Sequence, residues 1–488
     1  MTPPGGAPRR ANLLLVIADQ WRAGALGFLG EDPVSTPHLD ALGARSKVLT
    51  QAVSNYPVCS PCRAMLMTGR YPYRNGVHLN VNSATAQLGV GLRPETPCWS
   101  DALAGAGYAL GYIGKWHLEA PVPADAAAGE GPREDGRVWD AYSPPAHRHG
   151  FGFWYAHGCC DDHLRPHYWH GDAPREAAVE VDGWSPEHET DVALSFLDGA
   201  AGDYHGTGTP FALVVSYNPP HQPFEQVPPE HLRHYEGLSG RDLLPRPNVD
   251  WDGPTAADAV HAAPRYYAAM TGVDRQMGRL LDALDRHGLT RDTYVVFTSD
   301  HGMQLGSHGL MYKNVPYEES MRVPFLVSRP GTVPPGRDDL LLGSPDVAPT
   351  LLGLLGESAA TPAGTQGQDL SAALLAPPGD RGCTRPDAAL YIGPAAEPGQ
   401  SDTRGLRTRT HKLIAAYGAG GVRLHLFDLT ADPYELSDAA AEQPARVAAL
   451  AARLVAELDR TGDPWPGRAA LADEVRHLAR RAPAGEPR

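Results

Sequence analysis

Three apolar segments spaced far apart along the chain do most to limit the folds available to it. They are Leu13–Ala18, Phe211–Ser216 and Thr293–Thr298, and their composition is typical of strands buried on both faces. Between the last two, apolar residues recur at three- and four-residue steps from Tyr266 to Leu284, and Gly288 follows as a helix stop. Strands that alternate with helices predict an α/β sheet covered by helices on both faces.

Composition narrows the classes of function. Of the 488 residues, 42% are apolar and 20% are charged, as in globular proteins. The 57 acidic and 42 basic residues give a net charge of −15, which disfavours a broad binder of nucleic acid or anionic membrane. An anionic substrate would therefore need a local cationic pocket inside an acidic protein.

Side chains that can bind a metal ion directly follow two of the predicted strands. Asp19-Gln20 comes after the first strand, and Asp300-His301-Gly302 comes after the third. In open α/β sheets ligands bind beyond the carboxyl ends of strands, although a single Asp there is commonly a turn or N-cap residue. Oxygen ligands suit Ca²⁺ or Mg²⁺, and an imidazole also admits Mn²⁺.

A cysteine-rich segment, Cys59-Ser60-Pro61-Cys62-Arg63, runs into a short predicted helix closed by Gly69. Pro61 can open the helix, which places Cys59 near the free N–H groups that favour anions. Two other interpretations stay open: a buried structural cysteine, or a C-x-x-C redox pair of Cys59 and Cys62.

Cationic and imidazole side chains lie in three further segments. Gly114-Lys115-Trp116-His117-Leu118 would place Lys115 and His117 on one face if extended, and Pro219-Pro220-His221-Gln222-Pro223 fixes a histidine between prolines. Lys313 precedes Tyr317–Pro324. Taken singly, K-x-H is better explained as the polar face of a strand, and Lys313 as a solvent-exposed lysine. Packing explains His221 poorly, although turn chemistry would tolerate it.

In this order, C-x-P-x-R, G-K-W-H, P-H-x-P, D-H-G and the lysine before Tyr317–Pro324 resemble the motifs of the sulfatase family, the formylglycine-dependent type I enzymes of the alkaline-phosphatase-like superfamily. The similarity is to the branch with D-Q-W-R and D-H-G, and it spans about residues 12–460. It implies an α/β sandwich with a large mixed central sheet flanked by helices. A smaller C-terminal antiparallel sheet with one helix is also implied.

The resemblance assigns roles to the singled-out residues. A formylglycine-generating enzyme would act as a maturation partner and oxidise Cys59 to Cα-formylglycine, whose hydrate is the nucleophile. One divalent cation, with Ca²⁺ the first choice before Mn²⁺ or Mg²⁺, would bind Asp19, Gln20, residue 59, Asp300 and His301. The remaining catalytic and sulfate-binding residues are Arg63, Lys115, His117, His221 and Lys313.

In that scheme Lys115, His221 and Lys313 bind the sulfate, with Arg63 adding positive charge. His221 protonates the leaving oxygen, and His117 takes the proton that lets the aldehyde reform. The predicted reaction is hydrolysis of a sulfate ester, with a carbohydrate sulfate preferred over an aryl sulfate.

Three alternatives compete with that prediction. A phosphonate monoester or phosphodiester hydrolase could use the same site, but Lys115 and His117 favour sulfate. A catalytically silent binder of sulfated sugars is disfavoured because every catalytic position is chemically competent. The redox protein would leave Lys115, His117, Asp300 and His301 without a role.

The aromatic and histidine-rich stretch 147–170 either lines a sugar subsite or is a solvated loop, with neither favoured. Within it, adjacent Cys159 and Cys160 lack metal-ligand spacing and are expected to be structural.

We expect a catalytic domain over residues 10–385, a C-terminal α+β subdomain over 386–466 and a polar tail over 467–488. Six scattered cysteines argue against a disulfide scaffold, and no basic, hydrophobic, cleavable leader opens the chain, so we expect a cytoplasmic protein.

Overall fold

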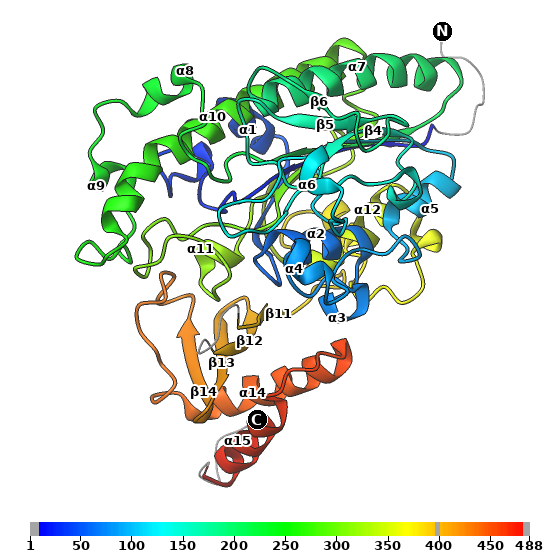
Figure 1. The fold of residues 1–488 in the computed structure, drawn as a ribbon. Coiled ribbons are helices and arrows are strands. Elements are labelled where there is room, and N and C mark those ends of the chain that lie inside the picture. Colours follow the sequence, from blue (N-terminus) through cyan, green and yellow to red (C-terminus); the bar gives the residue numbers. More distant parts are fainter. Residues whose placement is uncertain (1–8, 396–400, 482–488) are drawn as a thin grey trace.

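The computed structural model describes residues 9–395 and 401–481, which form two packed units (Figure 1). The larger unit is built on a ten-stranded mixed sheet, ordered β10-β2-β9-β8-β1-β7-β3-β4-β5-β6. In that order the strands are Gly336–Gly343, Lys47–Val53, Phe325–Ser328, Thr293–Ser299, Asn12–Ala18, Phe211–Tyr217, Ala109–Lys115, Phe153–His157, His167–His170 and Val179–Glu180. The three strands predicted from sequence are β1, β7 and β8, and they lie side by side in parallel.

Helices cover both faces of this sheet, as predicted. On one face lie α1 (Pro37–Gly43), α7 (Ser185–Gly206) and α10 (Ala256–Arg286). On the other lie α2 (Cys59–Thr68), α5 (Trp99–Gly105), α12 (Ser344–Leu354) and α13 (Ser371–Leu375). The alternation of side chains along β1 divides the core, because Leu14 and Val16 face the first group while Leu13 and Leu15 face the second.

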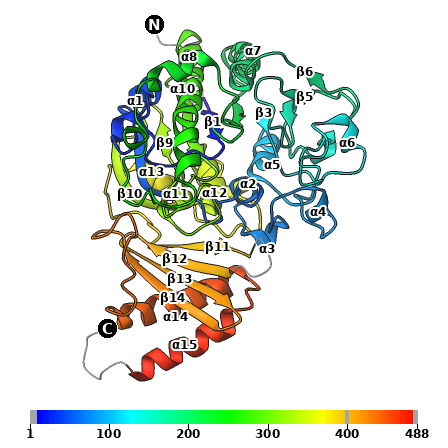
Figure 2. The same ribbon diagram turned by 60° about the vertical axis from the view of Figure 1, so that its left-hand side comes forward.

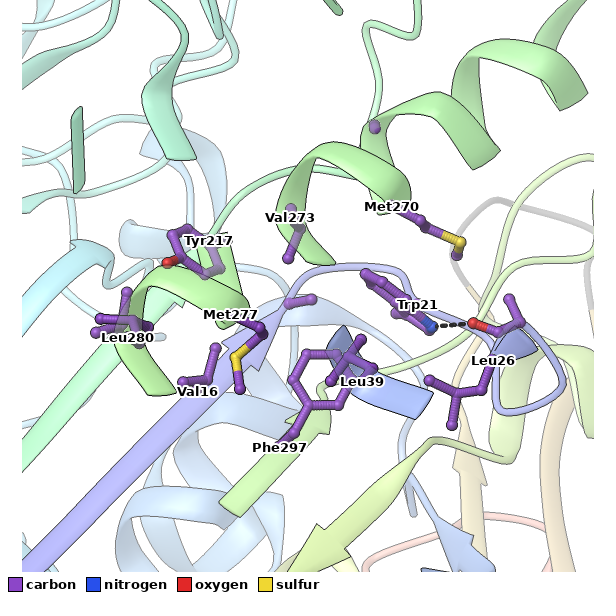
Figure 3. Close-up of a cluster of buried hydrophobic side chains, with 14 of the residues drawn as sticks. Val16, Trp21, Leu26, Leu39, Tyr217, Met270, Val273, Met277, Leu280 and Phe297 are labelled. Atoms are coloured by element: carbon purple, nitrogen blue, oxygen red, sulfur yellow. Dashed lines mark hydrogen bonds between the residues drawn. The ribbon is translucent and has the colours of Figure 1, made fainter. Parts of the chain in front are cut away.

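Helix α10 is the predicted amphipathic helix, extended toward its N-terminus. Its residues Met270, Val273 and Met277 pack over β1 and β8, where Trp21 meets Phe297 edge to face with centroids 5.2 Å apart (Figure 3). The Trp21 indole N–H donates to the Ala25 carbonyl at 2.7 Å. This packing fixes the chain directly after β1, which is where the metal-type residues begin.

The smaller unit is a four-stranded antiparallel sheet of β11 (Ala388–Gly393), β12 (Asp402–Thr408), β13 (His411–Gly418) and β14 (Gly421–Asp428). Two helices pack on it, α14 (Pro444–Thr461) and α15 (Arg468–Arg481), where the sequence predicted one (Figure 2). The expected tail 467–488 thus includes α15, whose Leu471 is buried in the core of this unit; residues 482–488 lie outside the described residues. The sheet begins near the expected boundary at residue 386, which stays a prediction.

Ten short helices complete the part of the chain that the structure describes. They are η1 (Gly27–Leu29), α3 (Pro72–Asn75), α4 (Ser83–Ala86), α6 (Asp125–Ala128), α8 (Pro229–Leu232), α9 (Gly240–Leu243), α11 (Glu318–Met321) and η4 (Ser358–Ala360), together with the single turns η2 (Pro145–His147) and η3 (Arg233–Tyr235). Within the described residues, no helix combines the length and apolar character needed to cross a lipid bilayer.

Candidate active site

The candidate site lies at one edge of the large sheet. Strands β8, β1, β7 and β3 are neighbours and parallel, so their carboxyl ends meet there. Asp300, Asp19 and Asn218 directly follow the first three strands, and His117 lies two residues after β3. Residues far apart in the sequence are thereby gathered at the position where α/β sheets bind ligands.

Four buried side chains form a potential cation site at this edge. Ligand atoms of Asp19, Cys59, Asp300 and His301 all lie within 4.8 Å of one another. The Cys59 Sγ lies 3.3 Å from Nε2 of His301 and 3.6 Å from Oδ1 of Asp19. Nδ1 of His301 is 2.9 Å from the Gly302 carbonyl, to which it donates, so the Nε2 lone pair faces the cluster. Two carboxylates and an imidazole, with burial lowering the pKa of that imidazole, fit a divalent cation.

Gln20 lies at the rim of this cluster in a left-handed conformation with φ 69°. Its backbone N–H donates to Asp300 Oδ1 at 3.2 Å, which ties the two strand ends together. Its side-chain oxygen accepts from Lys313 Nζ at 2.6 Å, and its Nε2 donates to Gln222 at 2.9 Å. The expected ligand therefore also connects the cluster to Lys313.

Arg63 lies behind the cluster, one turn along α2 from Cys59. Its Nε donates to Asp300 at 2.9 Å and its Nη2 to Asp19 at 3.2 Å. Nη1 donates to the Lys115 carbonyl at 3.0 Å and to the Ser216 hydroxyl at 2.7 Å. These contacts explain why the helix places an arginine four residues after the cysteine: the planar fork holds both carboxylates.

Lys115 is fully buried at the end of β3. Its ammonium lies 2.7 Å from Asp19 Oδ2 and donates to Asn218 Oδ1 at 2.9 Å. Burial alone would lower the pKa of Lys115, but the Asp19 carboxylate holds this pKa above its ordinary value. Lys115 is therefore a permanent cation beside the cluster.

His117 adopts φ 53°, which turns its side chain into the site. Its Nε2 is 3.0 Å from the Val81 carbonyl, which can only accept, so Nε2 carries the proton. Its Nδ1 is buried and has no hydrogen-bond partner among the described residues. Burial lowers the pKa of His117, an effect that the neighbouring Cys59 side chain partly offsets. The geometry of this imidazole is that of a neutral base aimed at residue 59.

His221 and Lys313 form a second pair, separate from Lys115 and His117. Nζ of Lys313 lies 2.9 Å from Nε2 of His221, while Nδ1 of His221 donates to the Gln222 carbonyl at 2.8 Å. Burial and then the Lys313 charge lower the pKa of His221 well below its ordinary value. The structure thus brings all of the predicted site residues to one edge of the sheet.

The sequence interpretation missed a carboxylate at this edge, Asp161. Its Oδ1 accepts from Asn218 Nδ2 at 3.0 Å and lies 3.7 Å from His221 Nδ1. Burial alone would raise the pKa of Asp161, but His221 and Arg133 hold it below its ordinary value. Asp161 lies four residues beyond the end of β4 and in no motif, so only the tertiary fold reveals it.

The stretch 147–170 is neither a solvated loop nor a free surface. It forms β4 and β5, and most of its imidazoles are buried. His163 Nε2, for example, lies 2.9 Å from the His221 carbonyl, which holds the P-H-x-P loop. The backbone carbonyls of Cys159 and Cys160 accept from Arg133 and Asn218 at 2.7 Å each. The stretch therefore supports the site from behind.

The redox interpretation of Cys59 and Cys62 is not supported. All six cysteines lie in the described residues and are free. Cys62 Sγ contacts the Ser344 hydroxyl at 3.3 Å, and burial raises the pKa of its thiol to about 12. A thiol so seldom ionised is a poor redox partner.

Comparison with known proteins agrees with this geometry. The family model described as Sulfatase matches residues 11–357, and one described as N-sulphoglucosamine sulphohydrolase, C-terminal, matches residues 306–462. The chain is 37% identical over 493 residues to an endo-4-O-sulfatase of Bacteroides thetaiotaomicron, covering 95% of each. It is 34% identical over 440 residues to an ulvan-active sulfatase of Formosa agariphila, covering 88% of this chain and 76% of that one.

Among solved structures, the sulfatase yidJ of Bacteroides fragilis superposes with a TM-score of 0.88 at 37% identity, covering 96% of this chain and 99% of that one. A phosphonate monoester hydrolase of Agrobacterium radiobacter, with a TM-score of 0.66 and 22% identity over 93% of this chain and 96% of that one, shares the fold. The match of both family models and of near-full-length relatives, together with the site described above, shows that this chain belongs to the sulfatase family and is a sulfuric ester hydrolase.

Proposed function

We propose that the protein hydrolyses the sulfate ester of a carbohydrate to an alcohol and inorganic sulfate, with an aldehyde derived from Cys59 as its nucleophilic centre. One observation carries the proposal. Cys59 begins α2 inside the carboxylate–imidazole cluster, and the unprotonated Nδ1 of His117 faces it.

The maturation step would be oxidation of Cys59 by a formylglycine-generating enzyme that recognises the C-x-P-x-R segment. Cys59 is only 2% exposed in the fold, so we infer that this partner acts before α2 packs. The hydrated aldehyde supplies a hydroxyl nucleophile and a second hydroxyl, whose deprotonation expels sulfate as the aldehyde reforms.

Asp19, Asp300 and His301 would hold the cation, with residue 59 and Gln20 at its edge, and Ca²⁺ is our first choice for so oxygen-rich a set. When bound, such an ion supplies Lewis-acid stabilisation of negative charge on oxygen. Arg63 orients Asp19 and Asp300, and its Nε, Nη1 and Nη2 atoms each donate to acceptors of the protein itself. We therefore assign it to positioning these carboxylates instead of binding sulfate.

The remaining groups bind the anion and move protons. Lys115 and Lys313 provide positive charge on two sides of the cluster, which suits the oxygens of a sulfate. In the substrate-free protein Lys313 Nζ lies 2.9 Å from His221 Nε2, and burial with the Lys313 charge lowers the pKa of that imidazole. The negative charge of a bound ester favours the cationic form of both, so that His221 Nε2 can protonate the leaving alcohol. His117 Nδ1 then accepts the proton from the second hydroxyl at residue 59.

The names of the relatives support a carbohydrate substrate. One 37%-identical relative is an endo-4-O-sulfatase, and a 35%-identical structure comes from work on glycosaminoglycan metabolism in Bacteroides thetaiotaomicron. Lys115 and His117 favour sulfate over phosphonate, because the paired lysine and histidine of G-K-W-H resemble the sulfatase motif. We propose 4-O-sulfated saccharides as the first substrates to assay.

The test compares sulfate release from a 4-O-sulfated disaccharide with hydrolysis of a phenylphosphonate monoester, using protein of measured aldehyde and metal content. We expect sulfate release that Cys59→Ala abolishes and that Cys62→Ala, the matched control three residues on, leaves in place. Faster cleavage of the phosphonate would support the phosphonate hydrolase instead. Inactivity toward both esters, with aldehyde and cation present, would indicate a silent binder.

A further inference from the structure

A short hairpin between β3 and β4 borders the candidate site and has no role in the mechanism above. Its turn is closed by a hydrogen bond of 3.0 Å from the Arg133 backbone N–H to the Arg137 carbonyl. Pro132 and Val138 form an isolated antiparallel β-bridge. Val138 is tied to Ser83 by two hydrogen bonds of 2.8 and 3.0 Å. Ser83 follows closely on Val81, whose carbonyl orients His117. The hairpin is therefore fixed to the same segment that sets the direction of the catalytic imidazole.

Trp139, the residue after that bridge, brings a partly exposed indole against the site. Its ring centroid lies 6.1 Å from that of His117, whose imidazole also interacts with the Cys59 side chain. The indole N–H donates to Asp135 at 3.2 Å within the same hairpin. Because its polar edge is already satisfied, what the ring can offer a ligand is its apolar face.

Arg133 holds this ring in place. Its guanidinium lies 5.5 Å from the Trp139 centroid and forms ion pairs with Asp161 at 2.7 Å and Glu130 at 2.9 Å. Two carboxylates neutralise its charge, so Arg133 is poorly suited to capture a sulfate itself. Asp161 also accepts from Asn218 at the site. The hairpin is thus anchored to the base of the site through one arginine.

We propose that Trp139 forms a wall of the sugar subsite on the His117 side of the site and stacks on the ring of the sugar that carries the sulfate, with Arg133 as its positioning residue. This inference rests on the proposed function and adds the subsite to it. A pyranose has apolar C–H faces and polar rims, and a rigid aromatic ring beside the reacting atoms suits such a face at little cost in side-chain entropy.

The test uses Trp139→Ala, Trp139→Leu and Trp139→Phe. In a Cys59→Ala background, which cannot turn over, calorimetry measures the Kd of a 4-O-sulfated disaccharide; in the active background, kinetics measures kcat and KM. We expect Ala and Leu to raise Kd and KM about tenfold, equivalent to about 1.4 kcal/mol, with kcat reduced by less. Phe, which keeps a ring, should recover most of the affinity.

The matched control is Trp251→Ala, because Trp251 is another partly exposed tryptophan with an arginine, Arg241, 4.4 Å from its ring centroid. It should change neither Kd nor KM. Should Trp139→Ala fail to fold, the comparison of Leu with Phe carries the test. Unchanged Kd and KM in the Ala or Leu variant would overturn the inference, as would a fall in kcat alone, which would make Trp139 a support for His117. A wild-type protein that neither binds nor cleaves any sulfated saccharide would instead overturn the proposed function.

Discussion

Replacing Lys115 by methionine removes one buried cation and keeps most of the side-chain volume. Lys115 is fully buried, with its ammonium 2.7 Å from Asp19 and 2.9 Å from Asn218. Breaking a buried ion pair by removing one partner costs about 3–5 kcal/mol. Arg63 still contacts Asp19 at 3.2 Å in the variant, so we expect the lower end of that range.

That cost can be converted into a melting temperature. An unfolding entropy of about 2.1 cal/mol/K per residue gives about 1 kcal/mol/K for 488 residues, so each kcal/mol shifts Tm by about 1 °C. For cooperative unfolding of the cation-free protein, Lys115→Met should lower Tm by about 3 °C. Its effect on turnover should be larger, because the loss of one donor to a developing oxyanion costs about 10²–10³-fold in kcat, or about 2.7–4 kcal/mol.

Lys47→Met is the matched control. Lys47 is also a fully buried lysine, on β2, and it donates to the Ala373 carbonyl at 3.0 Å. This variant should lose stability but keep kcat/KM for a sulfated saccharide. The assay is sulfate release by ion chromatography with equal aldehyde and cation content in all samples. A Lys115→Met protein whose kcat/KM stays within tenfold of wild type would refute the assignment of Lys115 to the sulfate.

Three further predictions concern proton transfer, the cation and pH. His117→Ala should release one equivalent of desulfated saccharide per site in a burst and then turn over more than about 100-fold more slowly, which quench-flow would detect; equal slowing of the burst would contradict a role after attack. Dialysis against a chelator should abolish sulfate release and lower Tm, and Ca²⁺ should restore both; activity that persists in metal-free protein would contradict the cation site. Burial and the nearby Glu318 raise the pKa of Glu435 to about 7, although Lys412 opposes the shift. The folded-state pKa of Glu435 lies above its unfolded value near 4.3, so the free energy of unfolding falls as pH rises from about 4.5 to 7. Over that window the Tm of wild type should fall by about 2–3 °C relative to that of Glu435→Gln. Parallel Tm–pH curves for the two proteins would contradict that pKa.

The sequence was sufficient to predict the central strands of the large sheet, but not the helices at the C-terminal end of the fold. Strands β1, β7 and β8 were predictable because a parallel strand covered on both faces is apolar throughout. Helix α15 was missed because it is strongly charged, and its apolar residues Leu471, Val475 and Leu478 only become significant once they pack against the second sheet. Local composition does not reveal that packing.

The site residues likewise fall into those that the sequence could locate and those that it could not. Residues such as Asp19 and Asp300 could be located because each directly follows a recognisable strand, and topology brings such ends together. Asp161 and Trp139 lie in irregular segments, where only hydrogen bonds and ion pairs with distant residues place them at the site. The function of Arg63 was also incompletely predicted, since its charge indicated an anion but not that the anions are Asp19 and Asp300.

The most direct test of the account is the mass of the peptide containing residue 59 from protein that is actively releasing sulfate. We predict that in this peptide an aldehyde replaces the thiol, in a fraction that rises in proportion to specific activity across preparations. Full activity from protein whose residue 59 is entirely unmodified cysteine would contradict it.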